Sequence, residues 1–308
     1  MPCSRPVSDG AAGREANPPG PARKAPDDLK GRLPAGLYLV ATPIGNARDI
    51  TLRTLDILAA ADLVACEDTR VTRRLLRIHG LKARLTAYHD HNAERVRPKL
   101  IAAIRAGKAV ALASDAGMPL VSDPGFGLVR AVRAEGLAVT SAPGANAALT
   151  ALQLSGLASD RFGFLGFLPA KRPARRRTLA PWAETPATLL VYEAGTRLAS
   201  CLADMAAVLG PREAAVAREL TKRHEEVVRG PLDELAARYA EAGPPKGEIV
   251  IVVGPPPEAE PAGVPDALLA ERIAALGLSR AAGELAAVSG RSRRDLYRRG
   301  LELLARDG

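Results

Sequence analysis

The stretch Leu37-Tyr38-Leu39-Val40-Ala41-Thr42-Pro43-Ile44-Gly45-Asn46 decides the fold of this chain. Its first four residues form a short apolar run, which is typical of a strand buried on both faces. Pro43 and Gly45 constrain the loop that follows, and residues 50–61 continue with the spacing of a helix. A strand that leads through a tight loop into a helix predicts the start of a parallel α/β sheet.

The same alternation continues through residue 156 and predicts an N-terminal α/β lobe over residues 35–156. We expect further strands at residues 63–66, 85–88, 110–113 and 138–140, and helices at 69–79, 92–106, 126–135 and 146–155. Ligands bind such sheets outside the carboxyl ends of the strands. The loops at those ends, residues 41–46, 114–124 and 142–146, should therefore lie close together.

A second α/β lobe is predicted over residues 157–256. We expect strands at 162–164, 188–192, 214–217 and 249–253, and helices at 172–183, 196–209 and 232–242. A cleft between the two lobes is then the default ligand site. After a proline-rich linker, residues 266–308 predict a small helical segment with helices at 266–276, 280–288 and 293–305. Residues 1–34 are rich in Pro, Gly and charge, which predicts a disordered tail.

The composition favours an acidic partner. The 308 residues carry a formal net charge of +9, which suits nucleic acid, although a basic protein without such a partner remains an alternative. No apolar run is long enough to cross a membrane, and the N-terminus lacks the apolar core of a signal peptide. The three cysteines are far apart in the sequence, so we expect no disulfide framework and a location in the cytoplasm. His89 and His91 lack further ligands nearby, so we expect no metal site.

The loop Ser114-Asp115-Ala116-Gly117-Met118-Pro119 directly follows a predicted buried strand. Gly117 allows close approach of a ligand, and the loop offers backbone amides and carbonyls. An ordinary turn stabilised by aspartates is the alternative. Neither this loop nor residues 41–46 carry the glycines of a dinucleotide fingerprint or the Gly-Lys-Ser/Thr of a phosphate loop, which disfavours NAD and ATP.

Charged residues follow three of the predicted strands. Glu67 and Asp68 come at the end of the second strand and could transfer protons, with Asp68 more simply the N-cap of the next helix. His89 could act as a base near neutral pH. Residues 218–226 form a dense charge run directly after a strand, where a role in the cleft competes with a solvated face.

Two basic stretches, residues 171–177 and 291–299, suit contact with a phosphate backbone, and solubility is the alternative. The second stretch lies in residues 278–301, which resemble a helix-turn-helix pair with Ser289-Gly290-Arg291-Ser292 as the turn.

From about residue 36 to 254 the chain resembles the bacterial small-subunit rRNA cytidine 2′-O-methyltransferases of the tetrapyrrole methylase superfamily. The resemblance rests on Leu39-Val40-Ala41-Thr42-Pro43-Ile44-Gly45-Asn46, Cys66-Glu67-Asp68-Thr69-Arg70, Ser114-Asp115-Ala116-Gly117, Phe167-Leu168-Pro169, Tyr192-Glu193 and Ala217-Arg218-Glu219-Leu220-Thr221-Lys222. Three departures are Met118 where the family usually has Thr, Ala194-Gly195-Thr196-Arg197 for Ser-Pro-His-Arg, and Pro143-Gly144-Ala145-Asn146 for Pro-Gly-Pro-Ser.

The resemblance implies two α/β lobes of the tetrapyrrole methylase type, S-adenosylmethionine (AdoMet) bound between them, and a homodimer. The implied substrate is a cytidine ribose in the decoding centre of 16S rRNA, in the small ribosomal subunit. The implied cofactor contacts are Pro43, Gly45, Asp115, Ala116, Gly117, Met118, Pro119, Pro143, Gly144, Ala145, Tyr192 and Ala217.

We predict Glu67 or His89 as the base that accepts the ribose proton, with Arg218 and Glu219 orienting the nucleotide. One alternative is a methylase of a small acidic tetrapyrrole, which would not need residues 171–177 or the C-terminal helices. The other is a non-enzymatic nucleic-acid-binding regulator, which leaves the strand-end loops without purpose. Truncation at Pro261 distinguishes this regulator from an enzyme, because a truncated enzyme would keep AdoMet binding whereas a truncated regulator would lose all function.

Overall fold

The computed structural model describes residues 33–257 and 264–306. Most of the predicted tail, residues 1–32, lies outside the described residues. Its last two residues belong to the fold: Leu33 is buried in the N-terminal core, and the backbone carbonyl of Pro34 accepts a hydrogen bond from Tyr38 Oη at 2.8 Å. Leu33 and Pro34 therefore belong to the first lobe.

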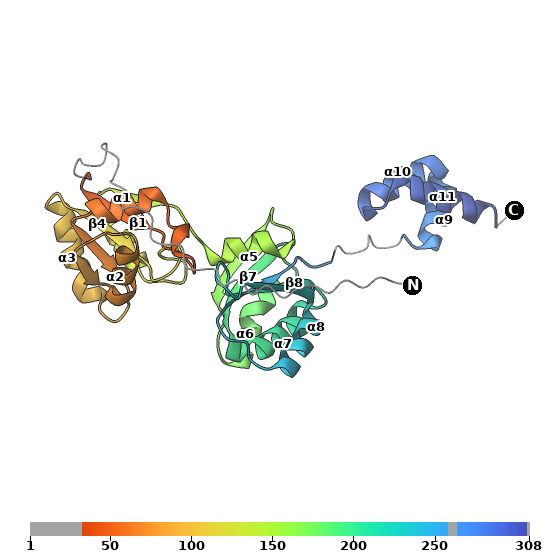
Figure 1. Cartoon of the computed structure of the whole chain (residues 1–308). Helices are drawn as coiled ribbons and strands as arrows, with labels where there is room; N and C mark the ends of the chain where they lie inside the picture. Colours follow the sequence, from red (N-terminus) through yellow and green to blue (C-terminus); the bar gives the residue numbers. More distant parts are fainter. Residues whose placement is uncertain (1–32, 258–263, 307–308) are drawn as a thin grey trace, which may run out of the picture.

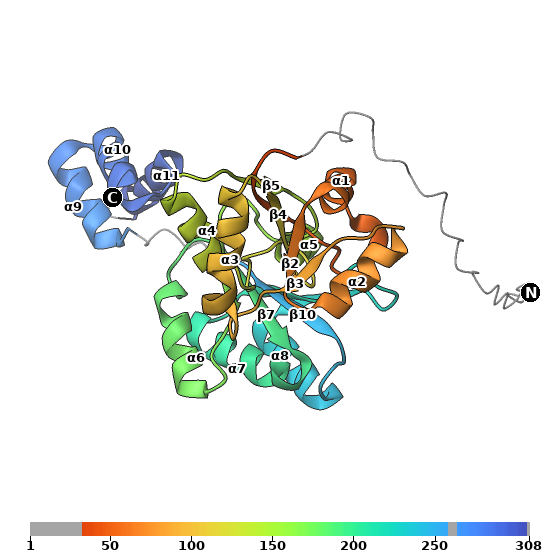
Figure 2. The ribbon, with the colours of Figure 1, turned by 90° about the vertical axis from the view of Figure 1, so that its left-hand side faces the viewer.

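The first lobe is a five-stranded parallel sheet with strand order β3-β2-β4-β1-β5 (Figures 1 and 2). Its strands are β1 (Gly36–Val40), β2 (Leu63–Cys66), β3 (Leu85–Ala87), β4 (Ala109–Ala113) and β5 (Val139–Ala142). Its helices are α1 (Leu52–Ala60), α2 (Thr69–Ile78), α3 (Ala93–Arg105) and α4 (Phe126–Ala134), with a 3-10 turn at Ala47–Asp49. The predicted parallel α/β fold is confirmed.

Helices cover both faces of this sheet. Alternate residues of β1 point to opposite sides, with Tyr38 and Val40 in the core under α1 and α2, and Leu37 in the core under α3 and α4. All five residues of β4 are buried, because this strand is central. That double burial explains why the strands read as continuous apolar runs.

The second lobe is a mixed sheet with strand order β6-β7-β10-β8-β9. Its strands are β6 (Phe162–Phe167), β7 (Thr188–Ala194), β8 (Glu213–Arg218), β9 (Glu226–Pro231) and β10 (Glu248–Val253). β6 pairs with β7 in parallel, and the other three pairs are antiparallel. One face packs on α6 (Arg172–Leu179), α7 (Leu198–Leu209) and α8 (Leu232–Ala242), with 3-10 turns at Ala180–Trp182 and Gly195–Arg197.

Strand β9 is absent from the sequence prediction. It is an edge strand, it pairs with β8 alone, and none of its residues is fully buried. It also contains Gly230 and Pro231, which are uncommon inside strands. Its hydrogen bonds to β8 stabilise it without the apolar pattern that a sequence search requires.

Helix α5 (Ala147–Ser155) packs on the second sheet, on the face opposite α6, α7 and α8 (Figure 1). Arg229 of β9 donates from Nε to the carbonyl of Ser155 at 2.8 Å. The expected boundary after residue 156 therefore does not coincide with the packing, which places the change of lobe at residues 143–146. A helix that lies between two sheets in the sequence can pack on either of them, and only its tertiary contacts show which one.

The C-terminal unit contains α9 (Asp266–Leu276), α10 (Leu278–Ser289) and α11 (Arg293–Leu304), which share a small core of their own. Between α10 and α11, Gly290 adopts φ 68° and the Ser292 side chain caps α11. These residues occupy the predicted turn of a helix-turn-helix pair. Within the described residues, no helix combines the length and apolarity that spanning a membrane requires.

Candidate active site between the lobes

The first two predicted loops meet at the carboxyl edge of the first sheet. β1 and β4 are adjacent and parallel, so the loops that follow them emerge together. Thr42 and Gly117 exchange two backbone hydrogen bonds of 2.9 and 3.0 Å, and Thr42 Oγ1 donates to the carbonyl of Ser114 at 3.1 Å. Gly117 adopts φ 79°, which a side chain would strain.

Backbone strain is concentrated in two loops that face one another. Among the described residues, the non-glycine residues with positive φ are Leu120, Ser122, Glu219 and Thr221, with φ of 72°, 67°, 51° and 64°. Two lie in the loop after β4 and two in the loop after β8. Such strain persists only where the surrounding structure imposes it, and it is concentrated at functional sites.

The two lobes interlock at Gly45. A Cβ atom on Gly45 would lie 2.5 Å from Lys222 Cγ, 2.7 Å from Thr221 Oγ1 and 2.9 Å from the carbonyl oxygen of Leu220. The backbone N–H of Asn46 donates to Thr221 Oγ1 at 3.1 Å. Glycine at this position thus allows the loop after β1 to approach the loop after β8.

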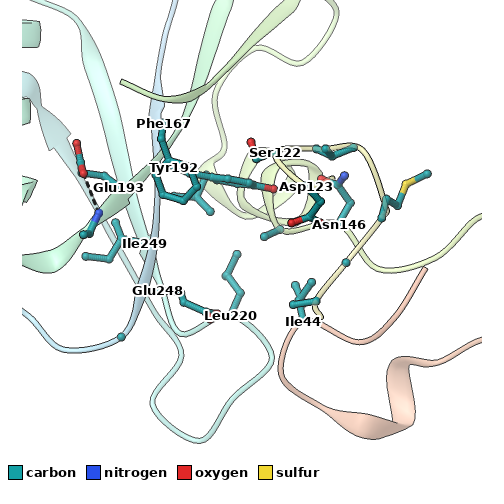
Figure 3. Close-up of a pocket in the computed structure, with 18 residues that line it drawn as sticks. Ile44, Ser122, Asp123, Asn146, Phe167, Tyr192, Glu193, Leu220, Glu248 and Ile249 are labelled. Carbon is teal, nitrogen blue, oxygen red and sulfur yellow. Dashed lines mark hydrogen bonds between the residues drawn. The ribbon is translucent and has the colours of Figure 1, made fainter. Parts of the chain in front are cut away.

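A cleft of about 360 Å³ lies between these loops (Figure 3). Ile44, Ser122, Asp123 and Asn146 face Tyr192 and Leu220 across it. Its wall is mostly apolar and includes three acidic residues, Asp123, Glu193 and Glu248, but the Glu193 side chain points away from the cleft toward Cys201 of α7. An apolar cavity of this size with a few placed polar groups is typical of a small-molecule site.

Two of these carboxylates are held within the protein. Asp123 accepts a hydrogen bond of 2.6 Å from Ser114 Oγ, and burial raises the pKa of this carboxyl despite that bond. Glu193 is 2 % exposed; its Oε1 lies 3.2 Å from Arg197 Nε and accepts from the backbone N–H of Ala194 at 2.8 Å, on the side of the sheet that packs on α7. Asp123 therefore gives the cleft its capacity for a ligand that is cationic or donates hydrogen bonds.

Four of the predicted cofactor residues line the cleft: Ala116, Gly117, Met118 and Tyr192. The others lie around it without lining it: Pro43, Gly45, Asp115, Pro119, Pro143, Gly144, Ala145 and Ala217. Ala217, for example, is buried inside the second sheet. The lining residues that were not among the predicted cofactor contacts include Ile44, Val121, Asn146, Phe167, Leu220 and residues 247–250. Leu220 and residues 247–250 belong to the second lobe, and no local sequence pattern predicts that these residues pack against the first lobe.

Beside the cleft, four acidic side chains gather at the ends of β2, β3 and β4. Glu67, Asp115, Asp123 and Asp90 influence one another, and His89 lies close to them. Burial raises the pKa of Glu67, the three neighbouring carboxylates raise it further, and His89 lowers it in part. A carboxylate with a raised pKa suits a proton acceptor better than an ordinary exposed one.

Asp68 has a structural role, as expected. Its Oδ1 accepts from the backbone N–H of Arg70 at 2.7 Å and caps α2, and its Oδ2 pairs with Arg70 at 2.6 Å. Hydrogen bonds from Arg70 lower the pKa of Asp68 to about 2. Its backbone N–H donates to Asp115 Oδ1 at 3.0 Å, which links α2 to the loop after β4.

The hydrogen bonds of Asn92 fix the orientation of the His89 ring. Asn92 Oδ1 accepts from the backbone N–H of His89 at 3.0 Å, so the Nδ2 atom faces His89 Nε2 at 3.1 Å and the carbonyl of Ala87 at 3.1 Å. An amide nitrogen can only donate, so Nε2 accepts, and a neutral ring carries its proton on Nδ1. Nδ1 is buried and has no partner among the described residues. The accepting nitrogen of His89 is therefore occupied by Asn92, which disfavours His89 as the proton acceptor.

Arg218 and Glu219 lie next to the cleft but outside its lining. Arg218 pairs with Glu226 at 3.0 Å. Glu219 pairs with Lys222 at 2.8 Å and accepts from the backbone N–H of Glu248 at 3.0 Å. Their charges stabilise the strained loop and the 247–250 segment, which does line the cleft.

Three of the five cations in the first basic stretch pair with one buried carboxylate. Arg172, Arg175 and Arg176 all pair with the buried Asp204 of α7, at 2.9, 2.6 and 2.7 Å. Arg175 is itself buried. Only Lys171 and Arg177 of this stretch remain exposed without an ion pair in the described chain. The expectation that the whole stretch contacts phosphate is therefore corrected for Arg175, which is buried, while the single negative charge of Asp204 offsets only one of the three cations.

The second basic stretch keeps more of its charge free. Arg298 pairs with Asp295, and Arg299 pairs with Asp266 and Glu302. Arg291 and Arg294 are exposed and form no ion pair within the described residues. This part of the C-terminal unit can still contact an acidic partner.

Comparison with known proteins identifies the family. Residues 36–236 match the model of the tetrapyrrole (corrin/porphyrin) methylases, and residues 258–304 match that of the RsmI C-terminal HTH domain. A protein of Mesorhizobium japonicum named ribosomal RNA small subunit methyltransferase I is 53% identical over 274 residues, which are 88% of this chain and 93% of the relative. The chain belongs to the ribosomal RNA small subunit methyltransferase I family. Its Escherichia coli O157:H7 member is 46% identical, over 86% of this chain and 94% of the relative.

Solved structures support the fold of this family. A diphthine synthase matches with TM-score 0.55 and 17% identity, over 71% of this chain and 89% of its own. The methyltransferase CobJ matches with TM-score 0.54 and 18% identity, over 72% and 94%. A Thermus thermophilus uroporphyrin-III C-methyl transferase, solved with S-adenyl homocysteine, matches with TM-score 0.50 and 21% identity, over 72% and 97%. These matches confirm two α/β lobes of the tetrapyrrole methylase type.

Proposed function

We propose that this protein transfers the methyl group of AdoMet to the 2′-hydroxyl of a cytidine in the decoding centre of 16S rRNA. The observation that carries the proposal is the cleft between two strained loops, in a chain that belongs to this family. The names of its relatives support rRNA of the small subunit as substrate. The cytidine and its 2′-oxygen rest on the resemblance of the sequence motifs.

The residues of the cleft fit AdoMet. Ile44, Tyr192 and Leu220 offer an apolar wall for an adenine ring, and Asp123 offers a carboxylate to a cationic ligand. When bound, AdoMet supplies an electrophilic methyl group on a sulfonium, and the protein has to align a ribose oxygen with it.

Among the two predicted bases, the hydrogen bonds favour Glu67. The ribose hydroxyl loses a proton as its oxygen gains the methyl group, so a nearby acceptor helps. Glu67 has a raised pKa, whereas the ring of His89 is held with its accepting nitrogen on Asn92. In this arrangement Glu67 accepts the proton, and Asn92 holds the His89 ring beside it.

The decisive experiment is transfer of a labelled methyl group to small ribosomal subunits from a strain that lacks this modification, followed by nucleoside mapping. We expect label on the ribose of one cytidine of 16S rRNA. Label on a base, or on no RNA at all, would overturn the proposal. Transfer to a tetrapyrrole instead would support the superfamily alternative, and binding of RNA without transfer would support the regulator.

An uncovered apolar surface supports a homodimer. Phe162, Phe164 and Phe167 of edge strand β6 pair with Thr188, Leu190 and Tyr192, alternate residues of β7, because the strand is irregular between Phe164 and Gly166. All three rings therefore lie on the same face of the sheet. Helix α5 packs on this face against the other four strands but not against β6. They are 47%, 37% and 60% exposed. We propose that a second copy covers them, and that the enzyme works in the cytoplasm, where ribosomes are.

Phe162→Ser should raise the Kd of this dimer about 10–100-fold. Complete burial of one Phe contributes about 1.5–3 kcal/mol, an interface can add about half of this for the 47% exposed Phe162, and a two-fold interface loses it twice. Analytical ultracentrifugation measures the Kd. Phe126→Ser is the matched control, since Phe126 is 66% exposed on α4 of the other lobe. An equal effect of both changes, or a monomeric wild-type protein, would contradict the β6 interface.

Gly45→Ala should raise the Kd for AdoMet about tenfold or more. The new methyl group would push the loop after β1 away from Leu220 and Thr221 and distort a cleft that Ile44 and Leu220 line. Calorimetric titration with AdoMet measures this. Gly283→Ala in α10 is the control, because its Cβ would meet Arg293 at an ordinary 3.6 Å. Unchanged AdoMet affinity in Gly45→Ala would mean that the lobes adjust freely.

A further inference from the structure

A second hollow lies on the first lobe, between edge strand β3 and helix α3, both labelled in Figure 2. Its volume is about 510 Å³. Four cationic side chains line it, those of Arg84, Arg95, Lys99 and Lys108, and all four residues are exposed. We call this hollow the basic groove.

The cations of the basic groove are free to bind an anion. Within the described part of the chain, none of the four lies within ion-pair distance of a carboxylate. The one carboxylate in the lining, Asp62, is occupied, because its Oδ2 accepts from the backbone N–H of Ala109 at 2.8 Å. This differs from residues 171–177, where three arginines share one buried aspartate.

The basic groove leads to the candidate active site. Asp62 and Lys108 lie just before β2 and β4, at the amino edge of the sheet, whereas Ala87 and Asn92 lie at the carboxyl edge. Asn92 both lines the groove and orients His89. A chain molecule bound along the groove would therefore end beside His89 and the acidic group around Glu67.

We propose that the basic groove binds the phosphodiester backbone of the RNA strand next to the nucleotide that is methylated. This rests on the proposed function, since it assumes an RNA substrate. Several exposed cations along one open channel match the regular phosphates of a nucleic acid, and contacts of this kind position the strand without reading its sequence. The carboxylates at the far end would repel phosphate, so the backbone contact stops where the reacting ribose has to enter.

The test compares two variants with the same loss of charge. The groove variant is Arg84→Gln/Arg95→Gln/Lys99→Gln/Lys108→Gln. The control is Arg73→Gln/Arg74→Gln/Arg77→Gln/Lys82→Gln, whose cations are exposed on α2 and the turn after it, and α2 packs on the opposite face of the same sheet from α3. Binding to unmodified small ribosomal subunits is measured over a range of salt concentrations, together with AdoMet affinity and steady-state kinetics.

We expect the groove variant to lower the slope of log K against log salt by about 3, since each lost phosphate contact removes about 0.7–0.9. Its KM for subunits should rise on the order of 10–100-fold more than that of the control, while AdoMet affinity and kcat at saturation stay within about twofold. Arg95→Gln/Lys99→Gln alone, a change of two exposed side chains, should give about half of the change in slope.

Equal salt slopes for the groove variant and the control would overturn the inference. A loss of affinity without a change in slope would also overturn it, and would point to a protein surface of the subunit instead. The binding measurement needs no methyl transfer. A wild-type protein that binds subunits through the groove but transfers no methyl group would therefore refute the proposed function and leave the groove assignment standing.

Discussion

Glu67→Gln is expected to lower kcat for methyl transfer about 10²–10⁴-fold, the usual contribution of a positioned general base. Glutamine keeps the shape of the side chain but cannot accept the ribose proton. AdoMet affinity should stay within about twofold, because Glu67 lies outside the lining of the cleft. Single-turnover transfer to unmodified small subunits measures the chemical step.

The pH dependence gives this prediction a second readout. A base has to be deprotonated, so the wild-type rate should rise with pH through the pKa of Glu67, which lies above its ordinary value. The Gln variant should lose that limb of the profile. Asp68→Asn is the matched control: it removes an adjacent carboxylate, keeps a side-chain oxygen that can cap α2, and should not cause this loss of rate. If Glu67→Gln and His89→Ala both keep wild-type turnover, neither residue is the base.

Asp204→Ala is expected to lower the free energy of unfolding by about 3–5 kcal/mol, because it leaves the guanidinium of Arg175 buried without a counter-charge. The side chains of Asp204 and Arg175 are 1% and 4% exposed. Urea denaturation measures the change. The matched control is Arg172→Ala, which removes a 67% exposed partner of the same carboxylate and should cost no more than about 1 kcal/mol. Equal effects of the two changes would contradict a buried ion pair.

Asp204 also predicts a dependence of stability on acid. Burial acts to raise the pKa of this carboxyl, but hydrogen bonds from Arg176, Arg175 and Arg172 outweigh burial and hold it below its ordinary value. A group whose pKa is lower in the folded state stabilises the fold above its unfolded pKa, about 3.9 for Asp. Its contribution should therefore be complete near neutral pH and disappear as the pH falls below about 4. The Ala variant should lack this part of the acid dependence.

Glu67, the proposed base, and Asp204, the structural carboxylate, could not be told apart by their local sequence. Glu67 follows a buried strand, which predicted a position at the carboxyl edge, and β2 does place it there. Asp204 lies inside the apolar helix α7, in a stretch without a motif. Its importance comes from three arginines about thirty residues away, and the same arginines had suggested an RNA contact.

The sequence by itself determined the first lobe, the strand-end position of the two central loops, and the family. It could do so because a parallel sheet covered on both faces requires short apolar strands, and because the carboxyl ends of adjacent parallel strands have to meet. Only the tertiary structure decided that α5 belongs to the second sheet, that Gly45 fits against Leu220 and Thr221, and that the hydrogen bonds of Asn92 orient His89. These facts depend on contacts between segments that are distant in the chain or on the direction of single side chains, and neither leaves a periodic pattern in the sequence.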